Sequence, residues 1–261
     1  AMIENLVIKR GRISGFHDGL RCENMSNSRI KELVVSGNTY EGVYLNGYDG
    51  QCNGNTIADC TISGNGNAGV YLYGYSGGCN GNTITDCTIS GNEDEGVYLR
   101  SFSGGQCDGN TIADCTISGN GDEGVYLRGS LGQCSGNTVA NCTIGDNTGR
   151  GIYLLGSQGQ CDGNTLHGNS IMRNVGHGID INGGDGNRIE GNNVWGTTGE
   201  GDTWGIYTSN TLNNLILKNS CVGNGTNYSL DSDDTAGPIV SASGFLSATG
   251  DASHPWANFS R

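Results

Sequence analysis

Proline and long apolar runs are scarce in this sequence. Only two of its 261 residues are proline, whereas 48 are glycine, and the glycines do not recur as collagen triplets. No segment reaches the roughly 18 to 20 consecutive apolar residues of a membrane-spanning helix. The first fifteen residues, AMIENLVIKRGRISG, lack the apolar core of a signal peptide. The sequence therefore predicts a turn-rich folded chain without a membrane span.

Basic residues are also few. Thirteen Lys and Arg residues stand against 26 Asp and Glu residues, which gives a net charge of −13. Such a field repels the phosphates of nucleic acids and anionic membranes, so neither is expected as a partner. Six of the thirteen basic residues lie within the first 31 positions. A local basic patch of this kind is usually a solvated surface.

Apolar segments of helical period are missing, and a repeat takes their place. The segment NTIADCTISGN at residue 55 has related copies that begin at 82, 110, 137, 164 and 187, with steps of 27 or 28 residues and a last step of 23. Weaker copies begin at 7, 28 and 214, which gives nine coils. A second segment, EGVYL at 41, 95 and 123, has a counterpart in each coil. Both segments alternate, are β-branched and are bounded by Gly and Asn, which predicts strands that stack coil upon coil.

These repeats resemble the right-handed parallel β-helix family of pectate and alginate lyases, mannuronan C5-epimerases, polygalacturonases and NosD-like proteins. The resemblance covers residues 5 to about 225. It implies an all-β fold: a single-stranded right-handed parallel β-helix of about nine coils over residues 1–225, with residues 226–261 as a C-terminal capping segment. No capping segment precedes Ile8. We therefore expect an upstream domain or a protein partner at the N-terminal end.

Two columns of aliphatic residues, and one of asparagine, follow from the repeat. The columns headed by Ile57 and Ile62 recur as Ile, Val or Leu in successive coils and are expected in the core. The asparagines are expected to stack at a turn, where asparagine tolerates left-handed backbone angles. They are Asn38, Asn65, Asn92, Asn120, Asn147, Asn174 and Asn224.

The eleven cysteines fall mainly into two further columns. Met25 and Leu33 replace cysteine at the ends of these columns, which indicates apolar, inward positions. Free buried thiols are one interpretation, and a disulfide across each coil, such as Cys52 with Cys60, is the other. Free thiols would favour a reducing compartment and disulfides an oxidising one. No CxxC pair is present, so a zinc site is not expected.

A column of tyrosines alternates outward from the core residues of the second segment. Tyr44, Tyr71, Tyr98, Tyr126 and Tyr153 form it, Asp180 interrupts it and Tyr207 resumes it. One interpretation is that aromatic residues simply suit a pleated surface. The other is a groove for a linear polysaccharide, in which sugar rings stack on aromatic faces. The predicted substrate-binding residues are Tyr44, Tyr71, Tyr73, Tyr98, Tyr126, Arg100, Arg128 and Trp204.

Catalytic residues are expected where the repeat degenerates, because the consensus coils repeat their residues without distinction. A lyase or epimerase must neutralise a uronate carboxylate, remove the C5 proton and supply a proton. Arg150 is the candidate for neutralisation, and His177 with Tyr153 or Tyr207 for the acid and base, beside Asp180. The resemblance to mannuronan epimerases lacks their Asp-Pro-His signature. Residues 176–178 match the Gly-His-Gly of polygalacturonases, but the Asn-Thr-Asp and paired aspartates of that family are absent.

Two groups of acidic residues are candidates for calcium, which prefers oxygen ligands. Asp94 and Glu95 are expected one coil below Asp122 and Glu123, and like charges at this spacing need screening, protonation or a cation. The second group is Asp231, Asp233 and Asp234.

Three functions remain open from the sequence. The first is a polysaccharide lyase or C5-epimerase, the second a non-catalytic glycan-binding solenoid, and the third a structural or adhesive rod that is part of a larger protein. A polysaccharide is the expected partner in the first two. Action on a polysaccharide would place the protein outside the cell or on its surface.

Overall fold

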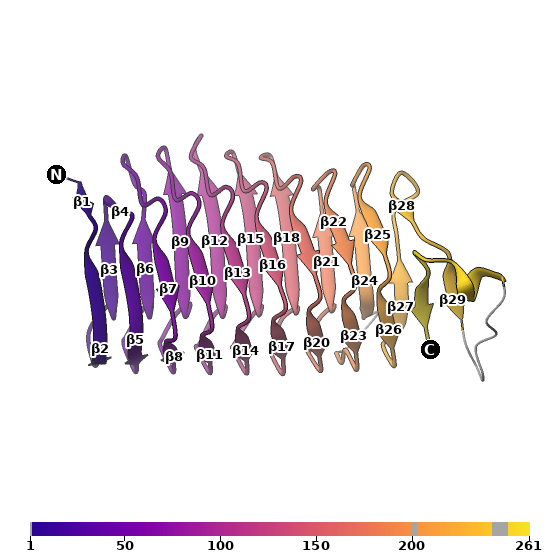
Figure 1. The fold of residues 1–261 in the computed structure, drawn as a ribbon, viewed down its shortest axis with the longest axis horizontal. Coiled ribbons are helices and arrows are strands. Elements are labelled where there is room, and N and C mark those ends of the chain that lie inside the picture. The colour runs from indigo at the N-terminus through magenta and orange to yellow at the C-terminus, as the bar shows by residue number, and fades with distance from the viewer. Residues whose placement is uncertain (1, 200–202, 242–249) are drawn as a thin grey trace.

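The computed structural model describes residues 2–199, 203–241 and 250–261, and it is a parallel β-solenoid. The coils stack side by side along one axis, with the N-terminus at one end and the C-terminal residues at the other (Figure 1). Every strand pairing between coils is parallel, because each strand lies against its equivalent one coil on. Among these described residues there is no helix long and apolar enough to cross a membrane.

One wall of the solenoid, the tyrosine sheet, carries the EGVYL-type segments. Within the described ranges it has nine strands. These are β3 (Leu20–Glu23), β6 (Val43–Asn46), β9 (Val70–Tyr75), β12 (Val97–Phe102), β15 (Val125–Ser130), β18 (Ile152–Ser157), β21 (Ile179–Asn182), β24 (Trp204–Ser209) and β27 (Thr226–Ser229). The seven from β6 to β24 follow each other at 27 or 28 residues, counted between register partners. The steps are shorter at both ends, from Leu20 to Val43 and from Ile206 to Tyr228.

The opposite wall, the bent sheet, carries the NTIADCTISGN-type segments. It begins with β2 (Val7–Ser14) and β5 (Arg29–Ser36), and each later coil contributes two strands of three residues. The first of each pair are β7 (Thr56–Ala58), β10 (Thr83–Thr85), β13 (Thr111–Ala113), β16 (Thr138–Ala140), β19 (Thr165–His167), β22 (Arg188–Glu190) and β25 (Leu215–Leu217). The second are β8 (Thr61–Ser63), β11 (Thr88–Ser90), β14 (Thr116–Ser118), β17 (Thr143–Gly145), β20 (Ser170–Met172), β23 (Asn193–Trp195) and β26 (Ser220–Val222).

A residue with positive φ makes the bend between the two strands of each pair. Asp59 has φ 55°, Asp86 has φ 54° and Asn141 has φ 54°. Asp and Asn occupy this left-handed region at a lower cost than most residues, and their recurrence from β7 to β16 favours the corner. Gly168, Gly191 and Lys218 take the same position in the last three pairs.

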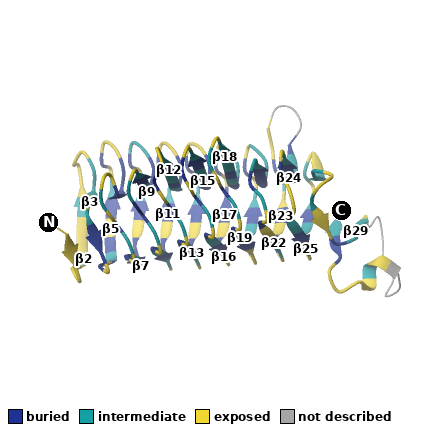
Figure 2. Cartoon of the chain, turned by 90° about the horizontal axis from the view of Figure 1, so that it is seen from above, coloured by how far each residue is buried: buried dark blue, intermediate teal, exposed yellow. Residues whose placement is uncertain are grey.

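The two ends of the solenoid differ from its middle. At the N-terminal end β1 (Ile3–Glu4) pairs with β4 (Met25–Ser26), and exposed residues gather on β2 (Figure 2). At the C-terminal end β28 (Thr235–Ala236) pairs with β25, and β30 (Asn258–Ser260) pairs with β26 and β29 (Ile239–Ser241). A short 3-10 helix, η1 (Gly250–Ser253), precedes β30. The expected partner at the N-terminal end stays a prediction.

Asparagine side chains connect successive coils in three columns, of which the shortest runs from Asn169 to Asn258. Asn65 Nδ2 donates to Asn92 Oδ1 at 2.8 Å, and this bond recurs along the predicted asparagine column from Asn38 to Asn174. A second column, which begins with Asn55 Nδ2 donating to Asn82 Oδ1 at 3.0 Å, runs to Asn214. This second column was not predicted from the sequence, although its asparagine opens each NTI motif. Buried amides bonded in this way stabilise the stack, because each satisfies both a side chain and a backbone group.

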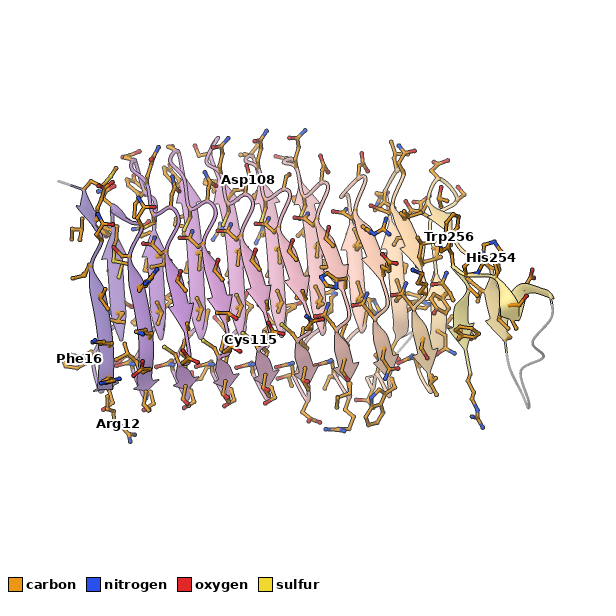
Figure 3. All side chains as sticks on the ribbon, viewed as in Figure 1. Arg12, Phe16, Asp108, Cys115, His254 and Trp256 are labelled. Carbon is orange, nitrogen blue, oxygen red and sulfur yellow. The ribbon has the colours of Figure 1, made fainter. Side chains whose placement is uncertain are left out.

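Aliphatic residues and cysteines fill the interior. The columns headed by Ile57 and Ile62 are buried throughout, as predicted. All eleven cysteines are buried and none forms a disulfide, so cross-coil pairing such as Cys52 with Cys60 does not occur. Cys115, labelled in Figure 3, donates to the carbonyl oxygen of Ala113 at 3.1 Å. The predicted fold class, an all-β parallel solenoid with a repeat of 27 or 28 residues, is confirmed.

Candidate functional site

The tyrosines of the predicted column form one continuous stack. Their ring centroids are 4.8 to 5.0 Å apart and neighbouring planes differ by 4 to 14°. We call Tyr44, Tyr71, Tyr98, Tyr126 and Tyr153 the tyrosine stack. Parallel pairing of in-register strands sets this spacing, because equivalent side chains lie one strand apart.

Arginine side chains cover both ends of the tyrosine stack. The Arg21 guanidinium lies 5.0 Å from the Tyr44 ring centroid, and that of Arg150 lies 4.0 Å from the Tyr153 ring centroid. Each ring face is therefore covered by another ring or by a cation. The expectation that sugar rings stack face-on upon these tyrosines is wrong for this stack. It presents ring edges and hydroxyl groups instead, and Tyr126 is only 9% exposed.

A second aromatic row lies four residues further along the chain than the tyrosine stack, at or just beyond the ends of the strands. Tyr48 stacks on Tyr75 with ring centroids 4.6 Å apart, and Tyr75 on Phe102 at 5.6 Å. Tyr73 lies between this row and the tyrosine stack, with its ring centroid 5.4 Å from that of Tyr71. The sequence analysis found Tyr73 but missed Tyr48, Tyr75 and Phe102. Alternation pointed to them, since they occupy the next outward position after Tyr73 and its equivalents.

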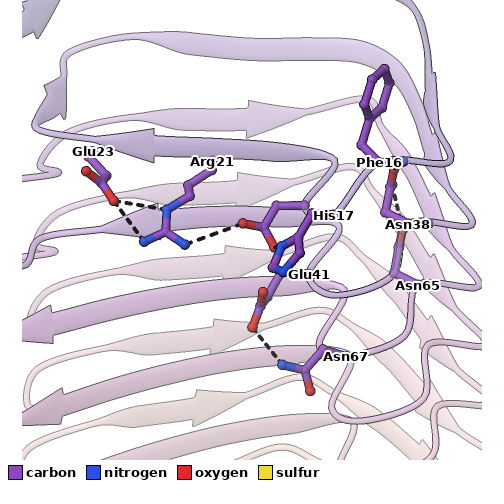
Figure 4. Close-up of polar contacts among 9 residues, drawn as sticks. Phe16, His17, Arg21, Glu23, Asn38, Glu41, Asn65 and Asn67 are labelled. Atoms are coloured by element: carbon purple, nitrogen blue, oxygen red, sulfur yellow. Dashed lines mark hydrogen bonds and ion pairs between the residues drawn. The ribbon is translucent and has the colours of Figure 1, made fainter.

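At the N-terminal end of the stack, Arg21 is held by acidic side chains (Figure 4). Arg21 Nη2 lies 2.9 Å from Glu23 Oε1, and Arg21 Nη1 lies 3.6 Å from Asp18 Oδ2. Glu41, one coil on, accepts a hydrogen bond from Asn67 Nδ2 at 2.6 Å. Burial raises the pKa of Glu41, and the Asp18 carboxyl beside it raises that pKa further. Glu23 and Asp18 therefore hold the Arg21 guanidinium over the Tyr44 ring.

At the other end, Arg150 joins two buried carboxylates from neighbouring coils. Arg150 Nε donates to Asp180 Oδ2 at 2.6 Å, and Nη1 donates to Glu123 Oε1 at 2.8 Å. Asp180 takes the place of a tyrosine in the column, between Tyr153 and Tyr207. The predicted catalytic residues Arg150, Tyr153 and Asp180 are thus in direct contact. Arg150, however, is already balanced by two acids, which argues against its predicted role of neutralising a substrate carboxylate.

His177 and Trp204 lie on the next two coils of the same wall. The Trp204 backbone N–H donates to His177 Nδ1 at 3.2 Å, so a neutral imidazole carries its proton on Nε2. Nε2 lies 4.0 Å from Asp180 Oδ2. Burial, assisted by the Arg150 charge, lowers the pKa of His177 to about 4. Trp204 stacks on Tyr207 with ring centroids 4.3 Å apart, so His177, Trp204 and Tyr207 form one cluster.

A cavity of about 290 Å³ opens beside Arg150. Glu123, Arg150 and His177 line it together with Asp122 and the backbone of Gly149 and Gly176. Burial raises the pKa of Asp180 to about 6 in spite of the Arg150 charge, and Asp180 Oδ1 has no hydrogen-bond partner. Burial, with the neighbouring Asp122 carboxylate, raises the pKa of Glu123 to about 7. These are values at which a carboxyl group exchanges protons near neutral pH.

Three of the four acids in the first predicted calcium group come together. The carboxylates of Glu95, Asp122 and Glu123 offer oxygens within 4.8 Å of one another, and Asp94 is not in this cluster. Burial, with the neighbouring acids, raises the pKa of Glu95 to about 7.

The acids of the second predicted calcium group accept hydrogen bonds from nearby residues of the chain. Asp234 accepts hydrogen bonds from the Thr211 hydroxyl and the Asn214 backbone N–H, and Asp231 accepts one from the Asp233 backbone N–H. Three acids of this group do not form a shared ligand cluster among the residues that the structure describes.

A further cavity, of about 420 Å³, lies at the C-terminal end. His254 and Trp256 lie beside each other there, with ring centroids 5.8 Å apart (Figure 3). Leu215, Leu217 and Pro238 make its walls largely apolar. It lies on the bent sheet, away from the tyrosine stack.

Comparison with known proteins identifies the architecture. The chain superposes on the A-module of a mannuronan C-5 epimerase from Azotobacter vinelandii with a TM-score of 0.58 and 18% identity, over 80% of this chain and 57% of that one. It superposes on tailspike protein 2 of Escherichia coli O157:H7 bacteriophage CAB120 with a TM-score of 0.67 and 14% identity, over 92% and 36% of the two chains. For pectate lyase Pel9A the TM-score is 0.54 and the identity 18%, over 88% and 60%.

These likenesses concern the fold, because the identities are low, and the chain spans little more than half of the epimerase module. No curated protein sequence matches the chain. A family model described as a right-handed β-helix region matches residues 2–194 and 106–252. The chain therefore belongs to the right-handed β-helix family.

Proposed function

We propose that this protein acts on a linear polysaccharide, which lies along the tyrosine sheet and places one sugar unit in the cavity at Arg150. The observation that carries the proposal is this cavity, which is lined by Glu123, with a pKa raised to about 7, and by a neutral His177. Asp180, with a pKa raised to about 6, lies next to the cavity and accepts a hydrogen bond from Arg150. The named activities of the epimerase and lyase with the same fold agree with it. Fold alone does not assign an activity, so the residues of the cavity have to carry the argument.

The candidate reaction is proton transfer at a uronate, as in a lyase or a C5-epimerase. Glu123, with a pKa of about 7, is ionised in part at neutral pH and is the best-placed base in the cavity. Burial raises the pKa of Tyr153, so its hydroxyl stays protonated at neutral pH and can donate a hydrogen bond to a substrate. Arg150 holds Glu123 and Asp180 in position through its two hydrogen bonds. His177 Nε2–H is a hydrogen-bond donor in this arrangement, because its other ring nitrogen accepts from Trp204.

Calcium fits the acidic cluster in part. Glu95, Asp122 and Glu123 supply hard oxygen ligands close together, although Arg150 occupies one oxygen of Glu123. A bound cation would supply positive charge for a substrate carboxylate, which the balanced Arg150 does not. We therefore keep these three residues as the proposed cation site; a cation bound there would lower the pKa of Glu123, so the base role with a pKa of about 7 applies to the cation-free cavity.

The test is a panel of acidic and neutral polysaccharides with and without calcium. Binding is read by affinity electrophoresis, cleavage by the ultraviolet absorbance of unsaturated uronate ends, and epimerisation by NMR. Glu123→Gln, which removes the proposed base, and His177→Ala, which removes the hydrogen-bond donor beside it, should each reduce turnover by about 100-fold or more. His167→Ala is the matched control, because His167 is exposed on the bent sheet. Equal turnover in all four proteins would refute the assignment of the cavity.

Binding without catalysis is the second candidate function. It is favoured by the regularity of coils β9 to β18, where the tyrosine stack repeats without distinction. Retardation by a polysaccharide with no absorbance and no NMR change would establish it. A protein that binds no member of the panel would be a structural rod.

A further inference from the structure

Two arginines on the tyrosine sheet have no acid beside them. Arg100 on β12 and Arg128 on β15 are direct register partners, one coil apart, which is a spacing of roughly 4.8 Å between strands. Neither forms an ion pair with any residue that the structure describes, although the chain carries 26 Asp and Glu residues. Like charges placed opposite each other on one face of a sheet repel. Such a pair is unexpected in an acidic protein unless it serves an anion.

Aromatic rings cover the Arg100 guanidinium, whereas Arg128 is hydrogen-bonded to the Tyr98 hydroxyl. The Arg100 guanidinium lies 5.5 Å from the ring centroids of Tyr73 and Phe102. The Nε atoms of Arg100 and Arg128 are buried without a hydrogen-bond partner, whereas both side chains are only half-buried. The Tyr71 and Tyr98 hydroxyls hydrogen-bond to Arg100 and Arg128, respectively, and so help to fix the two groups. Because a guanidinium carries five N–H donors, further terminal donors of each group remain for a ligand.

The contrast with Arg150 makes this pair the better candidate for recognising an anion. Arg150 donates to Asp180 and Glu123, so its charge is used within the protein. The charges of Arg100 and Arg128 are not paired with an acid among the described residues. Both arginines also lie one and two coils before β18, on the same outward face as the row of tyrosine hydroxyls. A polymer that reaches the cavity along this sheet would pass over them.

We propose that Arg100 and Arg128 together bind the anionic group, a carboxylate or a sulfate ester, of an acidic polysaccharide. The inference rests on the proposed function, and it adds the residues that recognise the anionic group of the polymer. A planar guanidinium matches a carboxylate or sulfate through paired N–H···O bonds, and two of them on adjacent strands can share one anion. Neutral polysaccharides lack the group that this pair recognises.

The test compares Arg100→Gln, Arg128→Gln and the double variant with the wild-type protein. Dissociation constants are measured for a polyuronate, a sulfated glycan and a neutral glucan at low and moderate salt. Each single substitution should weaken binding of the anionic polymers about tenfold, since a charge-assisted hydrogen bond is lost, and should leave the neutral polymer unaffected. The polymer bound more tightly, polyuronate or sulfated glycan, distinguishes the two anions. Arg173→Gln is the matched control, because it removes the same charge from an exposed pair with Asp146 on the other wall.

Two further measurements distinguish an effect of the lost charge from an effect on folding. Thermal unfolding of each variant shows whether the sheet is intact. Arg100→Lys with Arg128→Lys keeps both charges and should retain more affinity than the glutamine variants, at reduced selectivity. Unchanged affinity for acidic polymers in the double glutamine variant would overturn the inference and leave the proposed function standing. Binding of neutral polymers alone would do the same, and binding of no polymer would overturn both.

Discussion

Glu95 offers a direct test of the electrostatics in the acidic cluster. Its side chain is buried beside Asp122 and Glu123, and burial raises its pKa from an ordinary value of 4.5 to about 7. The perturbation is Glu95→Gln, which keeps the shape of the side chain and removes its charge. Glu93→Gln is the control, because Glu93 is exposed two residues away.

The sign of the effect follows from proton binding. Between pH 4.5 and about 7 the folded protein holds a proton on Glu95 that the unfolded chain has released. The free energy of unfolding therefore falls as the pH rises, by about 1.4 kcal/mol for each pH unit in this interval and about 3 kcal/mol in total. Stability from this group is fully present at pH 4 and is lost by pH 8. The glutamine variant has no such loss, so it should be about 3 kcal/mol more stable than wild type at pH 8.

Urea unfolding at pH 5 and pH 8, with a chelator to remove divalent cations, measures the difference. We expect the stabilisation by Glu95→Gln to be small at pH 5 and large at pH 8, while Glu93→Gln changes little at either. A variant no more stable than wild type at pH 8 would refute the claim that Glu95 is buried at a cost to its ionised form.

Three further predictions concern the stack, the thiols and the cation site. Tyr126→Ala should lower the free energy of unfolding by about 3 to 5 kcal/mol, because both faces of this buried ring are covered, whereas Tyr126→Phe should cost far less. The eleven buried thiols should react with a disulfide reagent only after denaturation; reaction of several thiols in the folded protein would contradict their burial. Calcium should raise the melting temperature of wild type at pH 8 but not that of Asp122→Asn, and an equal rise in both would exclude this cation site.

The fold could be predicted from the sequence because the sequence itself repeats with the period of the coils. The columns headed by Ile57 and Ile62 recur at a fixed interval, and only parallel stacking buries them all. The ends were harder. The steps from Leu20 to Val43 and from Ile206 to Tyr228 are shorter than the others because turns in these coils are shorter. The length of a turn has little effect on the hydrophobic pattern of the strands, so it is hard to predict.

The candidate site was predicted only as positions in columns. Tyr126 and its neighbours were correctly aligned, but alignment does not show that rings one coil apart cover each other's faces. The contact of Arg150 with Glu123 was not predicted, because Glu123 lies 27 residues earlier. That contact was legible in the sequence, since Glu123, Arg150 and His177 each precede the glycine of the same repeat segment and so occupy one column. Reading the columns for charge as well as for apolar character would have found it.

The arginine pair on the tyrosine sheet and the acidic cluster near the cavity predict how binding should depend on pH. Arg100 and Arg128 attract an anionic polymer, whereas Glu95, Asp122 and Glu123 repel the part of it that approaches the cavity. Because the pKa values of Glu95 and Glu123 are about 7, this repulsion weakens as the pH falls from 8 to 6 and both groups take up protons. Affinity for an acidic polysaccharide should therefore rise over that interval, calcium at pH 8 should have the same effect, and a neutral polymer should show neither. An affinity for acidic polymers that is independent of pH and calcium would mean that the chain on the sheet never reaches the Arg150 cavity.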